Sequence, residues 1–294
     1  MQASILTQVL LPAVLALIMF GMGLSLTKAD FTRLLEMPRA IILGLFGQVM
    51  LLPALAYATA VAFDLSPELA IGIMILSACP GGTMSNVISH LSRANLALSV
   101  SLTGITTLIC VSSTPWIIHF SISAFADTQG QAFSLLSTSV GLIFITFLPV
   151  LIGIGMRHKY PEIALRLEPR FRKLALAFMI VMIVAIVIQE RDTLISTFSQ
   201  VFWATLTLNI VAITVGVLLG KSFKLPHREQ LTLGIEVGIQ NASMAILIAI
   251  TFLKSPAFAT AAGVYGLTMY LGAGLLVVYA KLTAPKGNAK LAAN

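Results

Sequence analysis

The chain has 294 residues, of which 58% are hydrophobic and 10% are charged, and its formal net charge is +7. Soluble domains carry about 25% charged residues, so this composition excludes them and predicts an all-α protein that crosses a lipid bilayer several times. The apolar runs are long and continuous, whereas strands of a membrane β-barrel alternate over about 10 residues, so a barrel is also excluded.

Nine segments are apolar and long enough to be candidate membrane spans, for which about 20 residues are needed. In chain order they are 5–26, 40–63, 69–92, 95–123, 133–156, 174–189, 201–220, 231–253 and 257–280. The gap at 157–173 is predicted to be a long basic loop.

The basic residues fall almost entirely on one side of this predicted arrangement. Because Lys and Arg concentrate on the cytoplasmic side, we expect an external N-terminus, a cytoplasmic C-terminus and a location in the inner (plasma) membrane. Topology thus explains the positive charge, and no nucleic-acid partner is expected. Sixteen of the 18 basic residues lie in the cytoplasmic gaps (Lys28, Arg33, Arg39, Arg93, Arg157, Lys159, Arg166, Arg170, Arg172, Lys173, Lys221, Lys224, Arg228, Lys281, Lys286 and Lys290), and the opposite gaps hold Arg191 and Lys254.

Glu236 is the only acidic residue inside an apolar segment. A carboxylate at bilayer depth costs about 2.5–3.5 kcal/mol on insertion scales, so it predicts an ion or substrate site. Gln240 follows one helical turn later on the same face, and Gly234 and Gly238 weaken the helix around both side chains. The alternative is a structural polar cluster whose groups are satisfied by neighbouring helices.

The third segment carries Pro80-Gly-Gly82 at its centre. Proline removes a backbone donor and clashes with the preceding turn, and two glycines cannot hold a helix against that clash. We expect a break with free backbone groups, which is typical of binding sites in transporters. A proline-kinked structural helix is the alternative. Side-chain oxygens beside the break come from Thr83, Ser85 and Asn86.

The third and eighth segments carry their polar centres about 160 residues apart, and Gln48 in the second segment matches Asn209 in the seventh at the same offset. This spacing suggests two repeats of opposite orientation, as in many transporters. The first repeat and the start of the second would occupy 1–156, and the rest of the second would occupy 157–294.

Several other polar side chains lie at membrane depth. Ser99 and Thr103 share a face of the fourth segment, yet hydroxyl residues also occur at helix interfaces because they pack well. Gln48 has two equally possible roles: it could be an ion ligand, or it could form a hydrogen bond between helices. Three polar residues of the last segment could line a cavity or lie at a helix interface: Tyr265, Thr268 and Tyr270.

No sequence feature predicts an enzyme. The four histidines have no metal-ligand spacing, and no nucleophile–base pair or zinc-protease motif occurs. Cys79 and Cys110 both lie in apolar segments, so they do not indicate a disulfide framework.

Three motifs in this order resemble the bile acid:sodium symporter family: Phe20-Gly-Met-Gly-Leu24, Cys79-Pro-Gly-Gly-Thr-Met-Ser-Asn-Val87 and Ile235-Glu-Val-Gly-Ile-Gln-Asn241. The similarity covers nearly the whole chain. It implies two inverted repeats, a flat panel domain and a core domain with two crossing discontinuous helices, in one integral membrane unit. Relative to the family's ten spans, we expect this chain to lack the first panel helix. The core helices would lie at about 69–123 and 231–280, with 40–63 and 201–220 adjoining.

The resemblance also implies two sodium ions behind the helix crossing. The first would be bound by Ser85, Asn86, Ser99, Thr103 and Glu236. The second would be bound by Gln48, Glu236, Val237, Ile239 and Gln240, in part through backbone carbonyls. One carboxylate shared by two hard cations is chemically reasonable, because such ions prefer oxygen ligands.

The organic anion would bind on the opposite side of the crossing, near Thr83, Gly82 and Asn241. Some bacterial relatives carry a Trp-His-Asn run in the last helix that faces the substrate. Here the corresponding residues are Thr268-Met-Tyr-Leu271, so the resemblance does not define which anion binds.

The sequence therefore predicts a sodium-coupled secondary active symporter that imports an organic anion by alternating access. The substrate would be bile acid-like, pantoate-like or another small carboxylate. The alternative is a proton-coupled transporter in which Glu236 carries the proton. The lipid bilayer is an expected partner, and no obligate protein partner is predicted.

Overall fold

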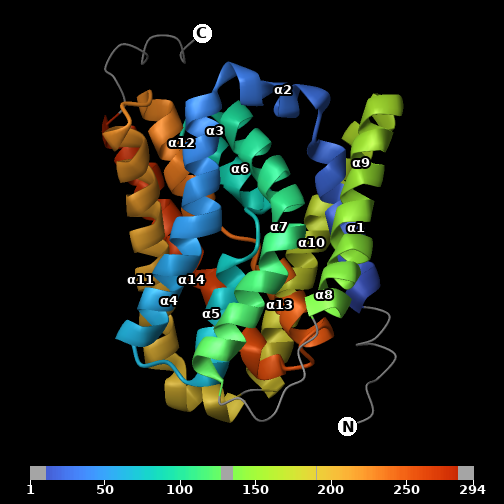
Figure 1. Ribbon diagram of the computed structural model, residues 1–294. Coiled ribbons are helices and arrows are strands. Elements are labelled where there is room, and N and C mark those ends of the chain that lie inside the picture. Colours follow the sequence, from blue (N-terminus) through green and yellow to red (C-terminus); the bar gives the residue numbers. More distant parts are fainter. Residues whose placement is uncertain (1–10, 127–134, 190, 284–294) are drawn as a thin grey trace.

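The computed structural model describes residues 11–126, 135–189 and 191–283, and every regular element in these ranges is a helix (Figure 1). In chain order the elements are α1 (Leu11–Ser25), α2 (Lys28–Glu36), α3 (Pro38–Phe46), η2 (Gly47–Leu51), α4 (Leu52–Ala62), α5 (Pro67–Ser77), α6 (Thr83–Leu91), α7 (Leu96–Phe125), α8 (Leu135–Leu142), η3 (Ile143–Phe147), α9 (Leu148–Lys159), α10 (Pro161–Gln189), α11 (Arg191–Ser222), α12 (His227–Gly238), α13 (Ala242–Thr251) and α14 (Pro256–Thr283).

Five continuous helical stretches are long and apolar enough to cross a membrane: Pro38–Ala62, Leu96–Phe125, Ser139–Lys159, Thr197–Ser222 and Pro256–Thr283. The membrane-protein class is confirmed at this level, whereas the number of crossings stays a prediction. Residues 5–10 of the first predicted span, and 133–134 of the fifth, lie outside the described ranges.

The prediction of a long basic loop at 157–173 is wrong. The helix α9 continues to Lys159, and α10 begins at Pro161. Proline is favourable in the first turn of a helix because the N–H group that it lacks would have no helical partner there. Pro169 lies inside α10 without ending it. The charged residues of this region therefore lie on helix surfaces.

Two of the helical stretches contain a wider, π-helical turn just before a proline. In η2 the N–H of Leu52 donates to the carbonyl of Gly47, and in η3 the N–H of Leu148 donates to that of Ile143. Each donor precedes a proline, Pro53 or Pro149, whose ring clashes with the turn before it. The wider turn accommodates the ring and lets the helix continue, as is common at π-bulges.

The helices form two groups that lie side by side in Figure 1. The flanking group consists of α1, α8, η3, α9 and α10, and α1 packs mainly against α9 and α10. Within it, the backbones of α1 and α9 touch, because a Cβ atom at Gly23 would overlap the Val150 carbonyl and one at Gly153 would overlap that of Phe20.

The crossing group consists of α5, α6, α7, α12, α13 and α14. It contains two interrupted helices, one formed by α5 and α6 and the other by α12 and α13. The stretch α3–η2–α4 and the helix α11 pack against it. The helices α11 and α12 approach closely where glycines face each other, since a Cβ at Gly216 would lie 2.6 Å from the Leu233 carbonyl oxygen and 2.8 Å from the Gly234 Cα.

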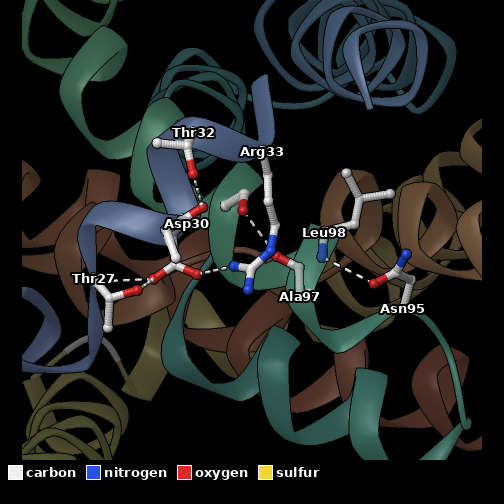
Figure 2. A network of polar contacts seen from close by, with 9 residues as sticks. Thr27, Asp30, Thr32, Arg33, Asn95, Ala97 and Leu98 are labelled. Atoms are coloured by element: carbon white, nitrogen blue, oxygen red, sulfur yellow. Dashed lines mark hydrogen bonds and ion pairs between the residues drawn. The ribbon is translucent and has the colours of Figure 1, made fainter. Parts of the chain in front are cut away.

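A short helix, α2, joins α1 to α3 at one end of the molecule (Figure 1). Its start is fixed by Asp30, whose carboxylate accepts hydrogen bonds from the backbone N–H and the hydroxyl of Thr27, both 2.7 Å long (Figure 2). Asp30 also pairs with Arg33. This reciprocal N-terminal cap stabilises a helix at Lys28–Glu36. The sequence analysis predicts only a gap between two spans there.

The turn between α6 and α7 is fixed at the same end. Asn95 caps α7 by accepting a hydrogen bond from the N–H of Leu98 (3.1 Å; Figure 2). Its own N–H donates to the hydroxyl of Thr232 on α12, at 3.0 Å. Asn95 therefore ties the start of α7 to α12.

Candidate functional site

The two interrupted helices meet at their breaks. The first interruption lies between Ser77 and Thr83, and the second lies between Gly238 and Ala242. The N–H of Asn241 donates to the carbonyl of Pro80 at 3.0 Å, and Gly81 pairs with Gln240 in an antiparallel bridge. The predicted break at Pro80-Gly-Gly82 is confirmed. Each unwound segment supplies partners for the other's backbone, as burial requires.

Glu236 lies beside this crossing and its side chain is fully buried. One carboxylate oxygen, Oε1, accepts a hydrogen bond from the Ser99 hydroxyl at 2.6 Å, and Oε2 accepts one from Thr103 at 2.9 Å. Both ion pairs between described side chains lie elsewhere. A buried carboxylate without a cation is costly, so this position favours a positively charged occupant or a proton.

Oxygen acceptors outnumber hydrogens around this carboxylate. The Ser99 hydroxyl has one hydrogen, yet it lies within hydrogen-bond distance of two acceptors, Glu236 Oε1 (2.6 Å) and Asn86 Oδ1 (2.9 Å). It also accepts from Ser89 at 3.0 Å. The Ser85 and Thr103 hydroxyls lie 3.3 Å apart. Such an oxygen-rich, hydrogen-poor cluster is what a hard cation prefers.

Gly81 allows these oxygens to come together. A Cβ atom at this position would lie 2.9 Å from Glu236 Oε2 and 3.4 Å from both the Ser85 and Thr103 hydroxyl oxygens. Any side chain here would therefore push into the cluster. The glycine is needed for this close approach of backbone to carboxylate.

A second polar cluster lies between η2 and the second interruption. Gln48 is buried, and its Nε2 donates to Gln240 Oε1 over a long 3.4 Å. The Gln48 Oε1 is buried without a hydrogen-bond partner among the described residues. Gln240 Nε2 donates to the carbonyls of Glu236 and Val237, at 2.9 Å each. Ile239, buried beside them, connects the two interrupted halves in an extended conformation.

The structure thus brings the predicted ion ligands into two adjacent clusters. In the orientation seen here, however, the Val237 carbonyl is already occupied by the amide of Gln240. Sequence reasoning missed Ser89, whose hydroxyl is bonded to that of Ser99. The helical spacing of Ser85 and Ser89 was the available signal, because residues four apart share a face.

The predicted anion residues Gly82 and Asn241 line a crevice between the flanking group and the crossing group, together with Gln240. Asn241 also caps α13 by accepting a hydrogen bond from the N–H of Met244 at 3.0 Å. The side chain of Thr83 lies outside the described part of the chain. The free volume of the crevice is about 50 Å³, which is room for a few water molecules.

Two residues of α10 place charge at this crevice, and the sequence analysis gave neither of them a role there. Arg172 and Glu168 both line it, and their nearest charged atoms are 3.7 Å apart. The sequence pattern places Arg172 only among the cytoplasmic basic residues. Tyr270 lines the crevice as well, and its buried hydroxyl has no hydrogen-bond partner among the described residues.

Tyr265, in contrast, lies at a helix interface, which resolves one of the alternatives left by the sequence. It is fully buried, and its hydroxyl donates to the carbonyl of Gly238 at 2.7 Å. Asn209, which the sequence matched to Gln48, donates to the same carbonyl at 2.7 Å.

Comparison with known proteins gives consistent similarities. The family model described as "Sodium Bile acid symporter family" matches residues 12–197. The chain is 29% identical to the uncharacterized sodium-dependent transporter YocS of Bacillus subtilis (strain 168), covering 90% of this chain and 81% of that protein. It is 26% identical to the probable sodium/metabolite cotransporter BASS1, chloroplastic, of Arabidopsis thaliana, covering 92% and 67%. It is 27% identical to the human ileal sodium/bile acid cotransporter, covering 83% and 70%.

Proposed function

Because this chain belongs to the sodium bile acid symporter family, which is a family of transporters and not of enzymes, we propose that it imports an organic anion together with sodium ions. Relatives named as sodium-dependent or as sodium/bile acid cotransporters support sodium as the coupling ion. The observation that carries the proposal is the buried Glu236 carboxylate, surrounded by hydroxyl and amide oxygens at the crossing of two interrupted helices.

The first sodium ion is bound by the cluster around Ser99 and Thr103. A cation there would replace hydrogen bonds that the hydroxyls cannot make simultaneously, since Ser99 faces two acceptors with one hydrogen. Neutralising the carboxylate also removes the main cost of its burial. The ligands are Ser85, Asn86, Ser99, Thr103 and Glu236.

The second sodium ion is bound by Gln48, Glu236, Gln240 and the carbonyls of Val237 and Ile239. The unpartnered Oε1 of Gln48 supports this assignment, because a buried acceptor without a donor is costly unless a cation or water meets it. Binding requires the Gln240 amide to rotate, so that its oxygen replaces the nitrogen that now faces Val237.

The anion binds in the crevice on the opposite side of the crossing, near Thr83, Gly82 and Asn241. The helices α6 and α13 both begin there, and helix N-termini attract negative charge. Arg172 adds a cation to the same crevice. Bile acid-like, pantoate-like and other small carboxylates all fit this chemistry.

Transport proceeds by alternating access in a protein of nine spans with inverted repeats, an external N-terminus and a cytoplasmic C-terminus, located in the inner membrane. The flanking group acts as the panel domain and the crossing group as the core. A free volume of about 50 Å³ is too small for an organic anion, so the two groups must separate when the anion enters. If two sodium ions accompany one monovalent anion, the membrane potential contributes about 2.3 kcal/mol per 100 mV to each cycle.

Uptake into proteoliposomes tests this function. We expect purified protein to concentrate radiolabelled taurocholate or pantoate when an inward sodium gradient is applied, and to stop doing so when choline replaces sodium. An inside-negative potential should accelerate uptake. Accumulation in sodium-free buffer that follows a pH gradient would instead support Glu236 as a proton carrier, and would contradict sodium coupling.

A further inference from the structure

We infer that Asn209 and Tyr265 are positioning residues for the second sodium ion, although neither belongs to its ligand set. They donate hydrogen bonds to one backbone carbonyl, that of Gly238 at the start of the second interruption, and thereby determine where the next carbonyl points. The inference rests on the proposed sodium coupling and adds to it a requirement located on α11 and α14.

The contacts converge on a single acceptor. The carbonyl oxygen of Gly238 accepts from Asn209 Nδ2 and from the Tyr265 hydroxyl, each at 2.7 Å, and the two donors lie 3.3 Å apart. Asn209 and Tyr265 are fully buried, and Gly238 is buried as well. Gly238 is the last residue of α12, where helical carbonyls lose their partners in the next turn. Two side chains from neighbouring helices replace that lost bond.

The direction of this carbonyl has a consequence for the following residue. Ile239 is extended, with φ −107° and ψ 104°, and successive carbonyls of an extended segment point to opposite sides. With the Gly238 carbonyl held towards α11 and α14, the Ile239 carbonyl is directed to the opposite side of the segment. That carbonyl is one of the proposed ligands of the second ion.

The predicted repeats give this arrangement a parallel. Asn209 matches Gln48 at an offset of about 160 residues, and Tyr265 follows Thr103 at nearly the same offset. Gln48 and Thr103 present oxygens to the proposed ion sites. Their counterparts Asn209 and Tyr265 present an N–H and an O–H to the Gly238 carbonyl. In the second repeat, hydrogen-bond donors would therefore orient an oxygen, as a cation would in the first.

Gly238 makes this restraint necessary. Its position admits only glycine, because a Cβ atom there would overlap Ile213, and glycine has the largest conformational freedom to lose on ordering. Without its two donors, the segment from Gly238 to Gln240 would have to be ordered by the ion itself. Sodium affinity then falls, because binding has to supply that ordering free energy.

The test uses Tyr265→Phe, which keeps the ring and removes one donor. In purified protein, the sodium concentration that gives half of the sodium-induced rise in Tm should increase about fivefold to tenfold, as expected for one lost buried hydrogen bond. In proteoliposomes at saturating sodium, the KM for taurocholate should stay within about twofold of wild type. Asn209→Ala should raise the sodium midpoint as well, and serves if the tyrosine variant does not fold.

Tyr279→Phe is the matched control, because Tyr279 is an exposed tyrosine on the same helix, and its sodium midpoint should equal that of wild type. A purely structural role would lower Tm equally in sodium and choline and leave the midpoint unchanged, which would overturn the inference alone. A wild-type protein whose Tm does not respond to sodium would overturn the proposed coupling and this inference together.

Discussion

The two helix interruptions meet in one place but have different causes. The first contains Pro80 and two glycines, so its own backbone prevents a helix. The second contains no proline; it follows Gly238, and its backbone is held by tertiary contacts from Asn209 and Tyr265 and by the local contact of the Gln240 amide with Val237. The first interruption is therefore determined by its own sequence, whereas the second depends on its neighbours, and we expect the second to be the one that responds to an ion.

The two interruptions also divide the chemistry. The first contributes a backbone segment that the Glu236 carboxylate can approach closely, since Gly81 has no side chain to block it. The second contributes the charge of Glu236 and the amide of Gln240. Substitutions on each side should separate these contributions.

The largest effect is expected for Glu236→Ala, which removes the buried carboxylate beside the crossing. Sodium-dependent taurocholate uptake should fall to the level of protein-free liposomes, because both proposed ions lose their shared carboxylate. Uptake like that of wild type would rule out the shared-carboxylate scheme. Glu229→Ala, on the first turn of the same helix, should retain uptake within about twofold and controls for a general effect of losing a carboxylate.

Gly81→Ala tests the first interruption. Its new methyl group would lie 2.9 Å from Glu236 Oε2, so the carboxylate must shift and the sodium-dependent rate should fall at least about tenfold, in line with overpacking costs of about 1–3 kcal/mol. Gly155→Ala is the control, because no atom lies within 4 Å of the added methyl group there. Equal rates for the two variants would show that the close approach at Gly81 is unimportant.

Gln240→Ala tests the adaptable part of the second interruption. Loss of its amide should raise the sodium concentration for half-maximal uptake about fivefold, the effect of about one buried hydrogen bond. Gln200→Ala removes a glutamine that donates to the Phe63 carbonyl far from the crossing, and should change stability without changing sodium dependence. An unchanged sodium dependence in Gln240→Ala would remove this residue from the ion site.

The smallest effect is expected on the crevice side. Arg172→Gln should raise the KM for taurocholate about threefold at saturating sodium, because Arg172 is 45% exposed and solvent screens its charge. The sodium midpoint should not change. Arg170→Gln, an exposed arginine on the same helix, provides the comparison, and an identical KM in both variants would exclude a specific role for Arg172.

The same contrast explains what the sequence could predict. Pro80 and Glu236 stand out locally, one by its covalent structure and one by its charge in an apolar segment, so the first break and the polar centre were predicted correctly. The roles of Tyr265 and Asn209 depend on residues 27 and 29 positions away, respectively, and no local pattern encodes such a meeting. The ion and anion assignments themselves stay predictions.

The start of α10 shows where a local sequence pattern gave a wrong prediction. Its basic residues and its place between two apolar segments suggested a loop, yet Pro161 begins a helix and Pro169 is contained in it. Charge density is a poor guide where a helix emerges from the bilayer, because one face meets water while the other packs on protein. Because a loop was predicted here, the position of Arg172 beside the crevice was not predicted. That position follows from the helix α10, which includes Arg172.

The contact between α1 and α9 sets the mechanics of the flanking group. Where two backbones touch at Gly23 and Gly153, no flexible side chain lies between them to absorb a displacement, so a force on one helix moves the other. In the proposed transport cycle we therefore expect the two helices to move together as one unit. A covalent tether between α1 and α9 should therefore leave the transport cycle running, whereas a tether of the same length from α1 to α13 should arrest it.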